Sequence, residues 1–204
     1  MGTRGAFGFR IDGVDKLSYN HFDSYPDGLG SEVIDQVKVK AVLATTKLGD
    51  MIENVRGIRQ VDQSDDPTTE DVEKYGALSN SGVSTGADWH SLLRNAQGRV
   101  DLLLDGTLDV MTDGNSFVVD SLFCEYAYIL DLDTTADRFC LEFYTGFNKD
   151  PEAPGRYAQL RDGDYCGVAL AAEIPLDRLH TVPTDELVTE LELASDARYP
   201  DDEG

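Results

Sequence analysis

The sequence predicts an α+β fold in which a mostly antiparallel sheet packs against helices. Two pairs of segments with alternating apolar residues, each pair joined by turn residues, predict two β-hairpins. Other segments carry apolar residues at helical spacing. In a chain of 204 residues these features predict a single domain over 1–204, with a frayed acidic tail at about 197–204.

The first hairpin is predicted close to the N-terminus. Alternating side chains favour strands over 7–11 and 17–21, and the Asp12-Gly13 pair between them tolerates the positive φ of a tight turn. This register places Thr3 to Gly5 opposite Phe22 to Ser24. The segment Tyr25-Pro26-Asp27-Gly28-Leu29-Gly30 then breaks the strand, because it contains a proline and two glycines.

Helices are predicted in most of the central segments. Ser31 is expected to cap the first of them, and Thr184 the last. Between these two, helical spacing or capping residues favour helices at 51–55, from Thr68 or Thr69 to Gly76, at 89–96 before Gly98, and at 100–104. Residues 57–68 are expected to form a polar, acidic loop.

The second hairpin has the clearest strand pattern in the chain. Apolar residues alternate over 122–132 and again over 139–147, with turn residues between the two runs. Residues 148–164 are rich in glycine, proline and charge, which favours a loop, and a further strand is predicted over 165–174.

The composition is strongly acidic. There are 39 acidic and 17 basic residues, which give a formal net charge of −22 and an isoelectric point of about 4.2. A surface of this sign disfavours direct binding to nucleic acids or anionic membranes. Three interpretations stay open: adaptation to high salt, mimicry of nucleic acid to capture a basic protein, and a surface that only favours solubility.

The sequence also predicts a cytoplasmic location. It contains no apolar run of roughly 20 residues that could span a bilayer, and its start lacks the pattern of a signal peptide. Cys124, Cys140 and Cys166 are odd in number and widely spaced, so free buried thiols are expected. No metal-ligand spacing and no cofactor motif is apparent, so we expect no metal and no cofactor; the oligomeric state is left open.

A candidate site lies at the base of the first hairpin. An α-amine, with a pKa near 8, could act as a base toward a neighbouring hydroxyl, and Arg4 could hold a carboxylate or an oxyanion. The alternative is structural: Asp23 could bond to turn amides or pair with Arg4. The candidate catalytic residues are Thr3, Arg4, Asn20, His21 and Asp23, and the candidate ligand-binding residues are Tyr19, Ser24 and Tyr25.

Several of these segments resemble a family of uncharacterised bacterial and phage proteins. Those proteins open with MGTRG and continue to a YPxGxG-like segment, as this chain does at 1–5 and 25–30, and segments 88–93, 120–125 and 142–147 are also similar. The resemblance covers most of the chain and implies no activity. It would place a phage-encoded protein in the host cytoplasm.

More distantly, the N-terminal hairpin resembles the start of N-terminal-nucleophile hydrolases. The resemblance implies an αββα sandwich and a Cys, Ser or Thr made N-terminal by processing. Gly2 follows Met1 here, so Thr3 would have to be exposed by a second cleavage.

Two functional hypotheses follow from the sequence. The first is a phage-type accessory protein with a domain of the N-terminal-nucleophile type, which either hydrolyses a small amide or ester or only binds a small-molecule ligand. The second is an acidic interaction protein that binds a basic host or viral protein through charge complementarity.

Overall fold

The computed structural model describes residues 2–42, 48–78, 88–96, 98–133 and 139–198, and it shows the expected α+β fold. Its main sheet has five strands in the order β2–β1–β5–β6–β9, with only the β1–β5 pair parallel. The sheet is therefore mostly antiparallel, as the sequence predicts. Its strands are β1 (Gly5–Ile11), β2 (Val14–Asn20), β5 (Tyr126–Asp131), β6 (Cys140–Thr145) and β9 (Ala169–Pro175).

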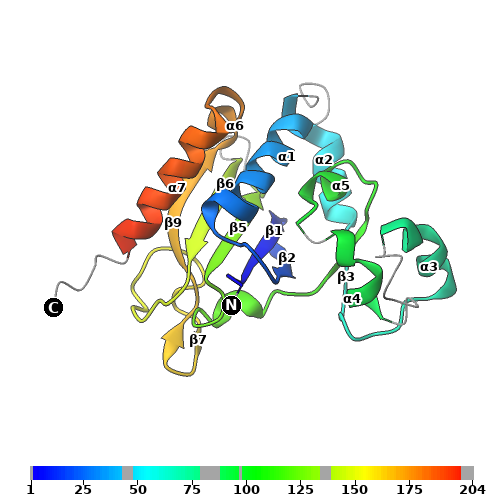
Figure 1. Cartoon of the computed structure of the whole chain (residues 1–204), viewed down its shortest axis with the longest axis horizontal. Coiled ribbons are helices and arrows are strands. Elements are labelled where there is room, and N and C mark those ends of the chain that lie inside the picture. The colour runs from blue at the N-terminus through cyan, green and yellow to red at the C-terminus, as the bar shows by residue number, and fades with distance from the viewer. Residues whose placement is uncertain (1, 43–47, 79–87, 97, 134–138, 199–204) are drawn as a thin grey trace.

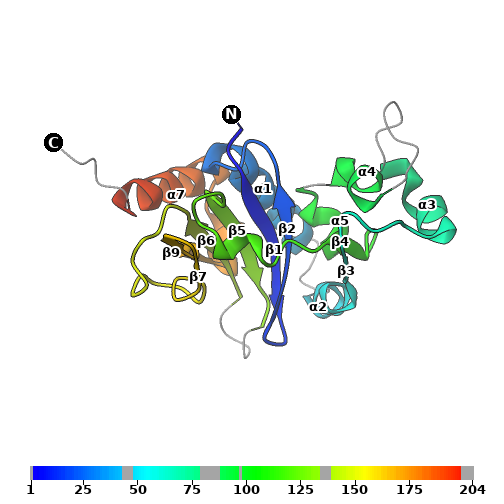
Figure 2. The same cartoon turned by 90° about the horizontal axis from the view of Figure 1, so that it is seen from below.

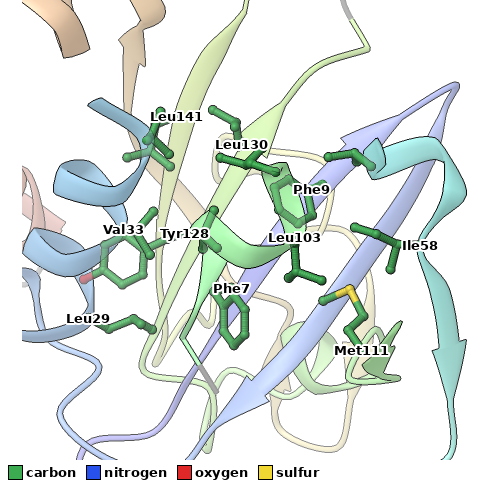
Figure 3. Packing of buried hydrophobic residues seen from close by; sticks show 14 of the residues in the cluster. Phe7, Phe9, Leu29, Val33, Ile58, Leu103, Met111, Tyr128, Leu130 and Leu141 are labelled. Carbon is green, nitrogen blue, oxygen red and sulfur yellow. The ribbon is translucent and has the colours of Figure 1, made fainter. Parts of the chain in front are cut away.

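Helices α1 (Ser31–Val42), α6 (Leu176–Thr181) and α7 (Thr184–Arg198) cover one face of this sheet (Figure 1). Large side chains from the strands, among them Phe7, Phe9 and Tyr128, form one buried cluster with Leu29 and Val33, and the Tyr128 ring lies beside these two (Figure 3). All five are almost fully buried. Since burying one large apolar side chain contributes about 1.5–3 kcal/mol, this layer contributes strongly to stability.

A lateral extension continues the same core beyond β2 (Figure 2). Two short strands in this extension pair in parallel as a separate two-stranded sheet. The extension consists of α2 (Leu48–Gly57), β3 (Arg59–Val61), α3 (Thr69–Tyr75), α4 (Trp89–Leu92), α5 (Val100–Leu104) and β4 (Val110–Thr112).

The second face of the main sheet is covered by irregular chain. The short 3₁₀ segment η5 (Phe117–Val119) and residues 148–168, which include β7 (Arg161–Asp162) and β8 (Tyr165–Cys166), pack on a smaller apolar cluster. Besides the main sheet, the described residues form only two two-stranded sheets. The αββα sandwich implied by the hydrolase resemblance is therefore absent from the described part of the chain.

Both predicted hairpins are confirmed, with Phe7 opposite Ser18 in the first and Tyr128 opposite Phe143 in the second. The second hairpin is shorter than expected, because the chain before Tyr126 turns back on itself. The Cys124 N–H donates to the Asp120 carbonyl at 2.9 Å, which closes this turn.

Other boundaries differ for identifiable reasons. Residues 57–68 contain β3, which the sequence analysis assigned to a loop. The predicted strand 165–174 divides at Gly167, where a Cβ would lie 2.3 Å from the Tyr157 carbonyl oxygen. Ser31 does not cap α1, because a helical turn, η1 (Pro26–Gly30), precedes it and its hydroxyl donates back to the carbonyls of Asp27 and Gly28.

Two further helix predictions also change. The helix predicted over 89–96 divides into α4 and a 3₁₀ turn over Arg94–Ala96. Thr184 is the first residue of α7 rather than its cap, and its hydroxyl contacts Asp35 and Lys38 of α1. Most of the acidic tail, 199–204, lies outside the described residues. None of the three cysteines forms a disulfide and all three are buried, as predicted.

Candidate functional site at the N-terminal hairpin

The first residues of the chain are fixed between the end of β2 and the segment that precedes β5. The Ser24 N–H donates to the Thr3 carbonyl at 3.2 Å, so residue 3 does lie beside the end of the returning chain. The predicted register is nevertheless wrong by two residues, because Gly5 lies opposite Asn20 rather than Phe22. On the other side, the Glu125 N–H donates to the Arg4 carbonyl at 3.0 Å, and the Arg4 N–H donates to Glu125 Oε1 at 3.2 Å. Residues 3 and 4 are thus held by backbone bonds on both sides.

Two of the predicted site residues form a buried support beneath the surface. Asn20 Nδ2 donates to Ser24 Oγ at 2.8 Å and also to the Phe22 carbonyl. The hydroxyl of the fully buried Tyr128 donates to the Ser24 carbonyl at 3.0 Å. Since buried polar groups need partners, these bonds fix the turn that follows β2.

Close backbone approaches explain the glycines of the Tyr25-Pro26-x-Gly28-x-Gly30 segment. Asp23 has a left-handed backbone with φ of 52°, and its carbonyl accepts the Leu29 N–H at 2.8 Å. A Cβ at Gly28 would lie 2.1 Å from that carbonyl oxygen, and a Cβ at Gly30 would lie 2.9 Å from the Tyr128 ring. Only glycine allows the chain to fold back this tightly before α1.

This fold-back leaves an open hollow of about 340 Å³ beside η1, which we call the acidic hollow. Its charged groups are all acidic. The Tyr25 hydroxyl donates to Asp23 Oδ1 at 3.2 Å, and the pKa of Tyr25 is raised, first by the negative charge of Asp23 and then by this bond. The hollow is lined by Asn20, Phe22, Asp23, Tyr25, Asp27, Gly28, Leu29, Glu32 and Gly98.

The remaining predicted residues make a second group of contacts. The Tyr19 hydroxyl lies 2.6 Å from His21 Nδ1, and the Arg4 guanidinium lies 4.8 Å from the centre of the Phe123 ring. Burial raises the pKa of Tyr19, and the positive charge of Arg4 opposes this rise. Because Arg4 stacks on Phe123, it does not form the ion pair with Asp23 that the structural alternative proposed.

The hydrolase hypothesis gives the role of base to an α-amine that processing of the chain would create beside the Thr3 hydroxyl. Within the described residues, no hydrogen bond joins that hydroxyl to His21 or Asp23. The backbone of Thr3 is held by its bond to Ser24. Catalysis by Thr3 therefore stays a prediction.

Sequence reasoning missed several residues of this region. Three residues that line the acidic hollow were not predicted as site residues. The sequence analysis assigned Asp27 to the turn, Glu32 to the first turn of the helix and Phe22 to the end of the strand. Phe123 and Phe147 were placed in regular strands, although each lies just outside one and is exposed. Gly146, which directly precedes Phe147, is the one sequence signal that β6 ends there.

No protein-family model, no curated protein and no solved structure matches this chain. The resemblance to the bacterial and phage family therefore stays a prediction. Among the described helices, none combines the length and apolarity needed to cross a membrane. Within the described residues, no group of three or more His, Cys, Asp or Glu side chains is arranged to hold a metal ion.

Proposed function

We propose that this protein is a binding protein whose acidic hollow receives a cationic side chain of a basic protein partner. The observation that carries the proposal is the composition of the hollow. Three carboxylates, those of Asp23, Asp27 and Glu32, line it together with the rings of Phe22 and Tyr25. Carboxylates pair with ammonium and guanidinium groups, and aromatic faces attract the same cations.

The rest of the molecule supports the same sign of partner. A net charge of −22 attracts a basic protein over a distance and repels nucleic acid. The hollow also has a rigid base, because the Asn20–Ser24 bond and the Tyr128 hydroxyl fix the turn beneath it. A cation that enters the hollow meets carboxylates that the fold already holds together.

The proposal is tested by titrating a fluorescent arginine–glycine peptide and measuring its anisotropy at low salt. The hollow variant is Asp23→Asn/Asp27→Asn, since asparagine accepts the left-handed backbone at position 23. The matched control is Glu70→Gln/Glu73→Gln on α3, which removes the same charge from exposed residues at the far side of the molecule (Figure 1).

We expect the hollow variant to lose about tenfold in affinity and the control about twofold or less, since each exposed pair contributes up to about 1 kcal/mol. Wild-type binding should weaken as salt is added. Equal losses of affinity in the two variants would mean that the peptide binds through the overall negative charge of the protein rather than in the hollow. The absence of wild-type binding would refute the proposal.

A further inference from the structure

Three phenylalanines are exposed, and all three lie at the edge of the main sheet where β1 and β5 begin and β2 and β6 end. Phe22, Phe123 and Phe147 have exposed fractions of 55%, 42% and 45%, whereas the other five phenylalanines are buried or half-buried. We call these three residues the aromatic rim. Exposed aromatic side chains along one edge of a sheet are typical of an interaction surface.

Contacts with residues 2–4 and with Ser121 connect the rim. A Cβ at Gly2 would lie 2.6 Å from the Phe22 ring, and the Arg4 guanidinium stacks on Phe123. The Phe147 N–H donates to the Ser121 carbonyl at 2.6 Å, two residues before Phe123. The rim therefore follows the chain start from the end of β2 to the end of β6.

The backbone of Phe147 gives the second observation. Its φ of 48° lies in the left-handed region, which aromatic residues rarely adopt and which glycine adopts without cost. Even so, a phenylalanine stands there with nearly half of its side chain in solvent. Strained backbone of this kind gathers at functional sites, where the side chain is used.

We propose that the rim is the apolar half of the docking surface and that it binds apolar side chains flanking the partner's basic residue; this inference rests on the proposed function. Phe22 belongs to both the rim and the acidic hollow, so the two surfaces are continuous. The partner segment is basic because the hollow is acidic. It carries apolar side chains because the rim presents phenyl rings.

Arg4 sets the orientation of that segment. No carboxylate of the described residues forms an ion pair with its guanidinium, which covers one face of Phe123. A second cation is repelled from this ring, and the three carboxylates of the hollow attract it instead. The basic side chain therefore enters on the Phe22 side, and the apolar side chains lie toward Phe123 and Phe147.

The test compares three peptides on the wild-type protein. The first has arginines flanked by leucine and phenylalanine, the second replaces these apolar residues with serine, and the third replaces the arginines with glutamine. We expect the basic–apolar peptide to bind about tenfold more tightly than the basic–polar one, with the neutral peptide the weakest.

Two variants locate the effect. Phe123→Ser/Phe147→Gly should remove the preference for the apolar peptide, and its folding is checked by circular dichroism, because glycine relieves the backbone at 147. The control Val39→Ser/Leu193→Ser changes two exposed apolar residues of α1 and α7 and should retain the preference.

The outcomes separate the two proposals. If the two arginine peptides bind the wild-type protein equally, the rim inference is overturned and the proposed function stands. If neither binds, both are overturned. If the neutral peptide binds as tightly as the basic–apolar one, the rim binds without the hollow, which also overturns the joint surface.

Discussion

Arg156 lies over the second face of the main sheet and holds carboxylates from two different strands. Its Nη1 donates to both carboxylate oxygens of Glu142 in β6, at 2.7 and 2.6 Å, and its Nε donates to Asp15 of β2 at 3.3 Å. The guanidinium also stacks on the rings of Tyr144 and Tyr157. Because Arg156 belongs to the irregular chain over residues 148–168, this network ties that chain to the sheet.

We expect Arg156→Met to destabilise the protein by about 3 kcal/mol at neutral pH, because it leaves the buried Glu142 carboxylate unpaired. Adding Glu142→Gln should restore about 1 kcal/mol or more, since a neutral amide costs less to bury. Urea denaturation of both variants measures these differences. The control Arg161→Met removes an exposed arginine of the same segment and should cost about 0.5 kcal/mol or less.

The pH dependence of Arg156→Met gives an independent check. Burial raises the pKa of Glu142 above its ordinary 4.5, and Arg156 opposes that rise, so the variant raises the pKa further. A carboxyl group with a raised folded-state pKa favours the folded state when protonated. The loss of unfolding free energy caused by Arg156→Met should therefore be smallest below pH 4.5 and should grow as the pH rises through the folded-state pKa of Glu142. A loss that does not change with pH would contradict this account.

Single residues were predictable from the sequence where a local rule decides them. The hairpin itself follows from alternation around Asp12-Gly13, and the proline and glycines of the 25–30 segment predicted that the strand ends before it. The Arg156 network was not predictable, because it joins Asp15 to residues 142–157 and its members share no periodicity. The exposure of Phe123 likewise depends on a strand boundary that local alternation places too early.

At the scale of elements, α3 depends on a reciprocal cap at its first turn. The Thr68 hydroxyl accepts the Asp71 N–H at 3.2 Å, and the Asp71 carboxylate accepts the Thr68 N–H at 3.0 Å and its hydroxyl at 2.7 Å. Asp71 also pairs with Arg59 of β3 at 2.6 Å. The cap thus joins α3 to the neighbouring two-stranded sheet.

We expect Thr68→Ala to lower the free energy of unfolding by about 1 kcal/mol, because the cap bond to the first turn is lost. The Thr68 hydroxyl is also the main cause of the lowered pKa of Asp71. The Asp71 carboxylate therefore contributes fully to the free energy of unfolding at pH values above its ordinary pKa of 3.8. This contribution is lost as the pH falls through the lowered pKa that Asp71 has in the folded state. Thr189→Ala, inside α7, is the control and should be neutral or slightly stabilising. Equal effects at both threonines would exclude a capping role.

The elements that the sequence predicted are those with local signals. The two hairpins and the helices with clear spacing or caps belong to this group. Strands β3 and β4 were missed because each has three residues and its partner is distant in the chain, so neither periodicity nor a turn marks them. The parallel pairing of β1 with β5, which sets the strand order of the main sheet, also lacks any local signal.

At the scale of the whole molecule, the charge was readable from composition, but its arrangement was not. The acidic hollow forms only because the chain folds back between Asp23 and Leu29 and brings Glu32 of α1 beside the end of β2. Mutual repulsion of the excess carboxylates opposes folding throughout the molecule. The net negative charge that favours binding of a basic partner therefore also lowers the free energy of unfolding in dilute buffer.

Added salt should raise the melting temperature, because it screens this repulsion. The Debye length falls from about 30 Å at 0.01 M to about 10 Å at 0.1 M, so most of the gain is expected in this interval. If screening recovers about 1–2 kcal/mol, the melting temperature of a domain of this size rises by about 2–8 °C. Calorimetric scans in sodium chloride and in choline chloride should agree, since screening does not depend on the cation.

A melting temperature that stays constant above about 0.1 M salt assigns the effect to screening. A rise that continues through molar salt indicates high-salt adaptation instead. A flat or falling melting temperature would mean that ion pairs such as Arg178–Glu190 outweigh the repulsion.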